Sequence, residues 1–147
     1  MPTSRASATL LDTPPLPVQT KLAAAWTSLM FLVIYIDYFH LYQPGEIDLI
    51  RDGVIFEFGI SASLMSVFYV VIAIPALMIM LSTMLPARIN RATNLVVGSL
   101  YVPVMVFNVV GSPSGWVPYY ALTIGVELLI LAAILRFAWS WPRTIAP

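Results

Sequence analysis

The sequence predicts an all-α protein in which four transmembrane helices form a bundle, with both termini on the cytoplasmic side. Hydrophobic residues make up 60% of the 147-residue chain and charged residues only 10%, whereas about 25% of the residues of a soluble domain are charged. The mean hydropathy is +0.90. The apolar residues form blocks of about twenty, the length at which a helix crosses the hydrocarbon layer of a bilayer. A soluble globule of this size could not cover so much apolar surface.

Residues 1–20 are expected to form a flexible tail before the membrane domain. Their prolines and their Ser and Thr residues neither favour a helix nor supply an apolar core. This stretch lacks the continuous apolar region and the small-residue cleavage site of a signal peptide, so the first helix is expected to enter the membrane uncleaved. A second short tail is expected at 143–147.

Residues 21–142 are expected to hold the four helices. Two prolines, Pro75 and Pro103, interrupt predicted helices, and each is expected to kink its helix. Each also leaves a carbonyl oxygen without its helical partner, and a side chain of a neighbouring helix can bind that oxygen. The Gln-Pro-Gly turn at 43–45 ends the first helix, because glycine permits the left-handed backbone of a tight turn. The predicted helices are 22–42, 60–85, 94–111 and 116–138.

The positions of the basic residues predict the orientation of the bundle. Short loops rich in Lys and Arg stay on the cytoplasmic side of a membrane. Arg51 lies alone on one side, so the loop 43–59 is expected outside and the protein is expected in the inner (cytoplasmic) membrane. The tryptophans lie near predicted helix ends, where their rings prefer the membrane interface. The six basic residues of the other side are Arg5, Lys21, Arg88, Arg91, Arg136 and Arg143, and the tryptophans are Trp26, Trp116, Trp139 and Trp141.

Polar side chains within the apolar helices form the candidate site. At a rise of about 1.5 Å per residue, they fall in the outer half of the bundle, and the inner half is expected to contain far fewer. We therefore expect a polar pocket that opens outward, with Glu127 near the midplane as its floor and the acidic loop as its roof. The candidate ligand-binding or proton-handling residues are Asp37, His40, Asn108, Tyr119, Tyr120 and Glu127.

Asp37 and His40 are three residues apart, so they project from one helical face and can reach hydrogen-bonding distance. A carboxylate that accepts from an imidazole N–H raises the basicity of the ring and fixes its tautomer. This pair is interpreted as proton-handling or ligand-binding, with Glu127 as a third member. The alternative is that both residues are hydrated near the interface and only lock the first helix in place. For Glu127 the alternative is a structural hydrogen bond to a facing helix.

No catalytic residue, cofactor or metal is expected. The chain contains no cysteine, and no His-x-x-His or Glu-x-x-His spacing supports a metal site built from Asp37, His40 and Glu127. His40 is the only histidine, which excludes a haem with two histidine ligands in one chain. Net charge is zero and the basic residues are scattered, so nucleic acid is not an expected partner. The expected partner is the lipid bilayer.

Three segments of the sequence resemble a known family. They are "KLAAAWTSLMFLVIYIDYFHLYQPGEI", "AIPALMIMLS" with "PARINRATNLVVG", and "WVPYYALTIGVELLILAAILRFAWSWP". Together they resemble a family of small, functionally uncharacterised bacterial integral membrane proteins with four helices. The resemblance covers residues 20–142 and implies the fold. It implies no mechanism and no site residues.

Two classes of function remain after these exclusions. The first is binding or movement of a small solute or a proton through the outward-facing pocket. The second is a non-catalytic accessory or oligomer-forming subunit of a membrane complex, in which buried polar groups only specify packing. An enzyme ranks third, because the sequence has no recognisable nucleophile or metal set. Four short helices are few for a transporter that acts alone, so transport would imply a homo-oligomer.

Overall fold

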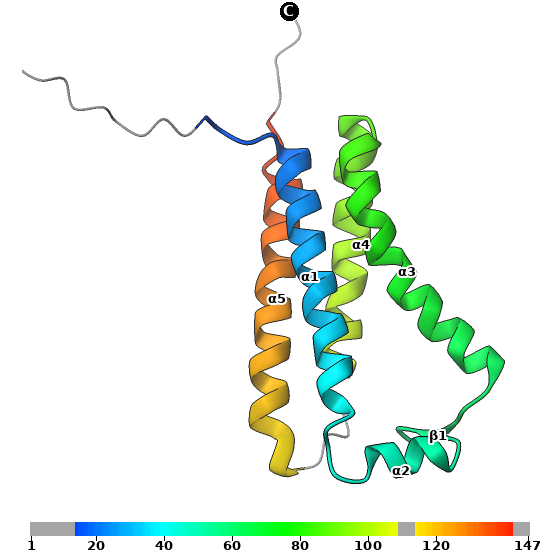
Figure 1. Ribbon diagram of the computed structural model, residues 1–147. Helices are drawn as coiled ribbons and strands as arrows, with labels where there is room; N and C mark the ends of the chain where they lie inside the picture. Colours follow the sequence, from blue (N-terminus) through cyan, green and yellow to red (C-terminus); the bar gives the residue numbers. More distant parts are fainter. Residues whose placement is uncertain (1–13, 109–113, 143–147) are drawn as a thin grey trace, which may run out of the picture.

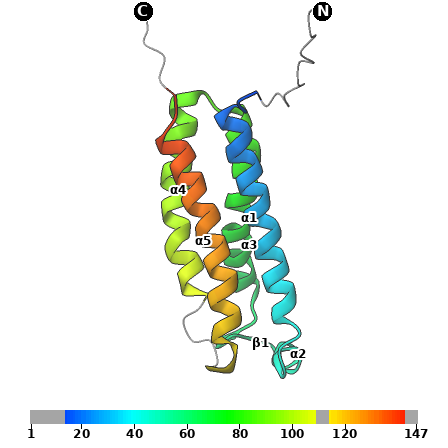
Figure 2. The ribbon, with the colours of Figure 1, turned by 90° about the vertical axis from the view of Figure 1, so that its left-hand side faces the viewer.

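The computed structural model describes residues 14–108 and 114–142, and in these residues the fold is a helical bundle (Figure 1). Helix α1 packs against α3 and α5, and α4 packs against α5. In both ribbon views, the start of α1, the end of α5 and the α3–α4 connection lie together at what we name the turn end (Figures 1 and 2). The long helices are α1 (Val18–His40), α3 (Ala62–Met84), α4 (Ala87–Phe107) and α5 (Val117–Trp139).

The opposite end, which we name the loop end, contains the short elements between α1 and α3. They are α2 (Glu46–Arg51) and the strands β1 (Val54–Ile55) and β2 (Phe58–Gly59). The strands are antiparallel, with Val54 opposite Gly59 and Ile55 opposite Phe58. A 3-10 turn, η1 (Ser114–Trp116), leads into α5.

The helix boundaries agree with the sequence prediction for the second and fourth helices and differ for the other two. Helix α1 begins at Val18, so the last residues of the predicted 1–20 tail are helical. Helix α4 begins at Ala87 instead of 94, because its polar first turns pack inside the bundle and do not form a loop. Residues 1–13, 109–111 and 143–147, on which the rest of the predicted tails and of the third helix fall, lie outside the described residues.

Three helices are long and apolar enough to cross a membrane: α1, α3 and α5. Each has 23 residues, a length of about 35 Å at 1.5 Å per residue, which exceeds the hydrocarbon thickness of a bilayer. Helix α4 is not among them, since it begins with the polar sequence "ARINRATN". The fold is therefore compatible with a membrane protein.

Helix α5 presents one continuous face to the other helices. Its buried residues follow one another in alternating steps of four and three, which is the spacing of a coiled-coil seam. Glu127 is the only charged member of this face, and it lies in the middle. Where α4 crosses α5, a side chain on Gly98 would place its Cβ 3.0 Å from Leu135 Cδ2, so glycine permits the close approach. The buried residues of α5 are Tyr120, Ile124, Glu127, Leu131, Ile134 and Ala138.

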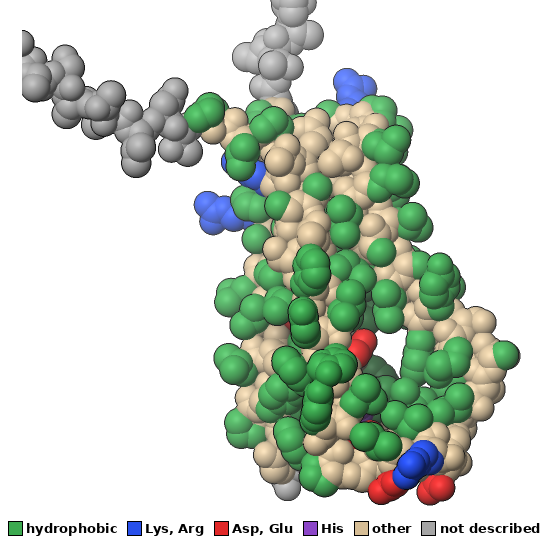
Figure 3. All heavy atoms as spheres, viewed as in Figure 1, with side chains coloured by type: hydrophobic (Ala, Val, Ile, Leu, Met, Phe, Trp, Pro, Cys, Tyr) green, Lys and Arg blue, Asp and Glu red, His purple; other side chains and the backbone are tan. Residues whose placement is uncertain are grey.

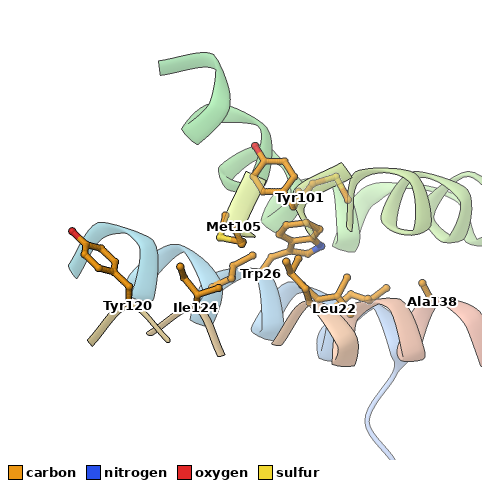
Figure 4. Packing of buried hydrophobic residues seen from close by; sticks show 11 residues of the cluster. Leu22, Trp26, Tyr101, Met105, Tyr120, Ile124 and Ala138 are labelled. Carbon is orange, nitrogen blue, oxygen red and sulfur yellow. The ribbon is translucent and has the colours of Figure 1, made fainter. Parts of the chain in front are cut away.

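Trp26 lies at the centre of the hydrophobic core, next to Leu22 and Tyr101 (Figure 4). The rings of Trp26 and Tyr101 meet edge to face, with centroids 6.1 Å apart. Trp26 is 0% exposed. The prediction that it lies at the membrane interface is therefore wrong, because its N–H has a partner inside the bundle and needs no water.

That partner belongs to a buried polar network that joins α1, α3 and α4. Trp26 Nε1 donates to Asn94 Oδ1 over 2.7 Å, and Asn94 Nδ2 donates to Asn90 Oδ1 over 2.7 Å. Asn90 Nδ2 donates to the carbonyl of Ser82 over 2.6 Å. Asn90, Asn94 and Ser82 are all fully buried. These residues lie in the turn-end half of the bundle, which the sequence predicts to be the inner half with few polar side chains. That expectation is wrong, because Asn90 lies in a segment that the sequence predicts to be a loop and Asn94 lies at the end of that segment.

Helix α3 bends near its middle, in the stretch that contains Pro75 (Figure 1). Proline has no N–H to bind the carbonyl four residues earlier, at Val71. The hydroxyl of Tyr101 on α4 donates to this carbonyl instead. The expected kink and its side-chain partner are thus present at Pro75, whereas α4 ends one turn after Pro103.

Beyond the bend, the loop-end half of α3 diverges from the bundle. None of its residues from 62 to 74 is buried. The space-filling view shows a hollow between this half of α3 and the rest of the bundle, with an acidic side chain at its edge (Figure 3). The bundle is therefore closed at the turn end and open on one side near the loop end.

Replacing Asn94 with Leu is expected to lower the free energy of unfolding by about 2 kcal/mol, because the buried N–H of Trp26 loses its acceptor. The measurement is thermal unfolding in detergent micelles, followed by tryptophan fluorescence. Thr83→Val is the control, because Thr83 is exposed and its hydroxyl bonds only within its own helix. Equal unfolding temperatures for the two variants would contradict a stabilising role for the network.

Candidate functional site

The hydroxyl of Tyr120 joins the end of α1 to the start of α5. It lies 2.8 Å from Nδ1 of His40, the last residue of α1. Gln43 Nε2, in the turn that follows α1, donates to the same hydroxyl over 2.7 Å. Gln43 is only 5% exposed. Two residues that are about eighty positions from Tyr120 in the sequence thus meet at one oxygen, whose donor and acceptor capacity allows both contacts.

His40 also connects the bundle to the loop-end elements. Its Nε2 lies 3.1 Å from Oε2 of Glu46, the first residue of α2, which is an ion-pair distance but not a well-directed hydrogen bond. Its ring packs against Phe56, with centroids 5.4 Å apart. Phe56 has a φ of 53°, which is rare for a residue other than glycine. We name His40, Gln43, Glu46 and Tyr120 the loop-end cover, because they attach the loop to the bundle.

Asp37 lies one turn before His40 on α1, and its side chain is exposed. The predicted hydrogen bond between Asp37 and His40 is absent, because the two ring nitrogens of His40 face Tyr120 and Glu46. The charge of Asp37 still interacts with that of His40. Within the described residues, Asp37 makes neither a hydrogen bond nor an ion pair with a side chain.

Glu127 lies on the buried face of α5 and is 1% exposed. Its Oε2 has no hydrogen-bond partner in the described part of the chain, and neither has the buried hydroxyl of Tyr119. Glu127 and Asp37 are close enough for their charges to interact, and both act on Tyr119. The two carboxyl groups therefore belong to one electrostatic cluster that extends from α1 to α5.

This cluster has no cationic side chain of its own. The ion pairs between described residues are His40–Glu46 and Arg51–Asp48, and both lie at the loop end. Burying a carboxylate without a partner is costly, so such a group takes up a proton or binds a cation. Within the described ranges 14–108 and 114–142, no three His, Cys, Asp or Glu side chains converge as metal ligands.

The six residues predicted from the sequence thus fall into three positions. His40 and Tyr120 are in direct contact. Asp37, Tyr119 and Glu127 form the electrostatic cluster next to them. Asn108 follows the last residue of α4 at the same end of the bundle, with an exposed side chain. Sequence reasoning missed the contacts that Gln43 and Glu46 make with this group, since a turn and an acidic loop give no signal of their tertiary partners.

The fold and the cluster together define a class of protein: a helical bundle with three helices able to cross a membrane and a buried carboxyl group between them. Residues 17–144 match the family described as "Family of unknown function (DUF6326)", and the chain belongs to this family. The match confirms the predicted membership in a functionally uncharacterised family. No curated protein and no solved structure matches the chain.

Replacing Tyr120 with Phe is expected to loosen the loop-end cover, because the buried amide of Gln43 loses its acceptor. Arg51 is the only basic residue between Lys21 and Arg88, so trypsin reports on the loop by cutting after it. We expect cleavage about fivefold faster, for a loss of ~1 kcal/mol in local stability. Tyr69→Phe is the control, because Tyr69 is 73% exposed. An unchanged cleavage rate would show that the hydroxyl does not hold the loop.

Proposed function

We propose that the chain is a multi-pass protein of the inner membrane that binds a proton or a small cationic solute at Glu127. In this arrangement α4 is the fourth membrane-spanning helix. Its polar first turns need not face lipid, because Asn90 and Asn94 bind other groups inside the bundle. This internal pairing is what a spanning segment requires of its polar groups.

The distribution of charge supports an orientation with both termini inside. Four basic residues lie at the turn end, where Lys21 packs on Phe137 and Arg91 donates to the carbonyl of Ala138 over 3.1 Å. Acidic residues predominate at the loop end (Figure 3). Basic segments stay in the cytoplasm, so the turn end is assigned to the inside and the loop-end cover to the outside. The basic residues at the turn end are Lys21, Arg88, Arg91 and Arg136.

The orientation can be tested with single cysteines, since the natural chain has none. Glu57→Cys lies in the loop and Ala87→Cys lies at the α3–α4 turn, and both positions are exposed. In intact cells whose outer membrane has been opened, a membrane-impermeant maleimide is expected to label position 57 at once. Position 87 should react only after the inner membrane is broken. The reverse pattern would invert the proposed topology.

The observation that carries the function is the unpaired carboxyl of Glu127. It lies in the middle of the buried face of α5, yet its Oε2 has no partner among the described residues. A purely structural carboxyl would be hydrogen-bonded, as the amides of Asn90 and Asn94 are. Asp37 adds a second negative charge from α1. A proton or cation that binds between the two helices would be attracted by both groups and would offset one of the two negative charges.

The loop-end cover would control access to this pocket from outside. Tyr120 lies two turns closer to the loop end of α5 than Glu127 does, so the contacts of Tyr120 with His40 and Gln43 lie between Glu127 and the external solution. The 3.1 Å contact between Nε2 of His40 and Oε2 of Glu46 also holds the cover closed. Opening of the cover would expose the pocket to the outside.

Dicyclohexylcarbodiimide reacts with protonated carboxyl groups in apolar surroundings, and it therefore tests whether Glu127 exchanges protons. We expect an adduct on Glu127 in lipid nanodiscs, located by peptide mass spectrometry. Labelling should slow as the pH is raised, because only the protonated form reacts. Glu127→Gln should abolish the adduct while thermal stability is kept, since the amide has the same shape without the charge.

The control for this test is Asp48→Asn, which removes a carboxylate from an 81% exposed side chain and should leave the labelling of Glu127 unchanged. Absence of any adduct on Glu127 in the wild-type protein would refute the proposed function.

A second candidate is an accessory or oligomer-forming subunit of a membrane complex. It is favoured by the loop-end half of α3, where residues 62–74 are unburied and mostly apolar. In that case Glu127 contributes to packing alone. Glu127→Gln would then weaken copurification with a partner chain, and the wild-type carboxyl would be unreactive towards the carbodiimide.

A further inference from the structure

We propose that the ligand of this pocket is a lipophilic cation, a molecule with one positively charged head group and an apolar tail, which enters from the bilayer between α1 and α3. This inference rests on the proposed function and names the class of ligand. It combines three features of the structure: the sign of the charge in the pocket, the route that is open to it, and the character of the walls along that route.

The charge in the pocket selects a cation. Asp37 and Glu127 approach from two helices, and the ion pairs of the described residues leave both without a cationic partner. The buried hydroxyl of Tyr119 also lacks a hydrogen-bond partner among the described residues, and the charges of Asp37 and Glu127 both act on it. A head group with one positive charge would be attracted by both carboxyl groups, would offset one negative charge, and could donate to or pack against the phenol.

The open route leads sideways. Towards the loop end, the His40–Tyr120–Gln43 contacts lie between Glu127 and the solution. Towards the turn end, the core around Trp26 and the network of Asn94 are fully buried. Between α1 and the loop-end half of α3, in contrast, the bundle is hollowed, and an acidic side chain lies at the edge of this hollow (Figure 3). A membrane-spanning bundle would expose this side to lipid.

The walls of the route are apolar. The loop-end half of α3 carries an open surface groove of about 280 Å³, lined by Ser66, Val67, Val70 and Val71 of this helix alone. The hydroxyl of Ser66 donates to the carbonyl of Ala62, so its proton is already used within the helix. On α1, the neighbour of Asp37 one turn away is Ile34, which is 52% exposed. A water-soluble cation would gain nothing from such walls, whereas an alkyl tail would remain in apolar surroundings along the whole path.

The test measures protection of Glu127 from dicyclohexylcarbodiimide in phosphatidylcholine nanodiscs by three matched probes. Dodecyltrimethylammonium has the charged head and the tail, dodecyldimethylamine oxide has the tail with no net charge, and tetramethylammonium has the head without the tail. We expect the first probe to slow the labelling about tenfold. The other two probes should leave the rate within about twofold of its value without a probe.

Two variants distinguish binding in the pocket from a change in surface charge of the bilayer. In Asp37→Asn, protection by dodecyltrimethylammonium is expected to disappear, with each rate compared with that of the same variant without probe. In Asp48→Asn, which changes an exposed loop residue, protection should be retained. Protection that persists in Asp37→Asn would mean a general surface effect and would overturn the inference.

The outcomes also separate this inference from the proposed function. Equal protection by tetramethylammonium would mean entry from water, and would refute the lipophilic ligand while the cation site stands. Equal protection by the amine oxide would mean that the tail alone binds, and would refute the requirement for charge. Absence of any reaction at Glu127 would refute the cation site itself.

Discussion

The hydrogen bonds of Asn94 fix the arrangement on which the rest of the bundle depends. One side-chain amide accepts from Trp26 of α1 and from Ser82 of α3, and donates to Asn90 of its own helix. These groups have no access to water, so breaking one bond leaves a buried polar atom unpaired. The network therefore holds three helices at one level. It holds the last turns of α3 next to α4 at the turn end, whereas the half of α3 before Pro75 diverges from the bundle.

Two kinds of buried polar group coexist in this fold, and the difference between them is the basis of the proposed site. The amides of Asn90 and Asn94 have partners on their own or neighbouring helices. The carboxyl of Glu127 is buried to the same degree, but its Oε2 has none among the described residues. An apolar interior penalises an unpaired polar atom. The hydrogen bonds of the two amides offset the cost of burying them, whereas no such bond offsets the cost of burying Oε2 of Glu127. In the function proposed above, a proton or cation would be the partner of this oxygen.

The sequence predicts the α3 and α5 boundaries well, because each apolar block is bounded by proline, glycine or tryptophan. The prediction from the sequence fails at the start of α4. The segment "INRATN" has the composition of a loop, although its two amides face inward. The sequence singles out Asp37, His40 and Glu127, since charge in an apolar helix is costly. Their partners could not be predicted. The spacing of Asp37 and His40 suggests a hydrogen bond between them, but Nδ1 of His40 instead contacts the hydroxyl of Tyr120, eighty residues away in the sequence.

The hydroxyl of Tyr101 has a consequence for how this family could diversify. It replaces the backbone hydrogen bond that Pro75 removes from α3, so the angle at which half of a helix leans outward depends on a single phenol from α4. A homologue with an apolar ring at this position would need another donor for the carbonyl of Val71, because Pro75 would still interrupt the helix. One substitution on α4 would thus act on the bend of α3, the helix that borders the hollow, without any change in the sequence of α3.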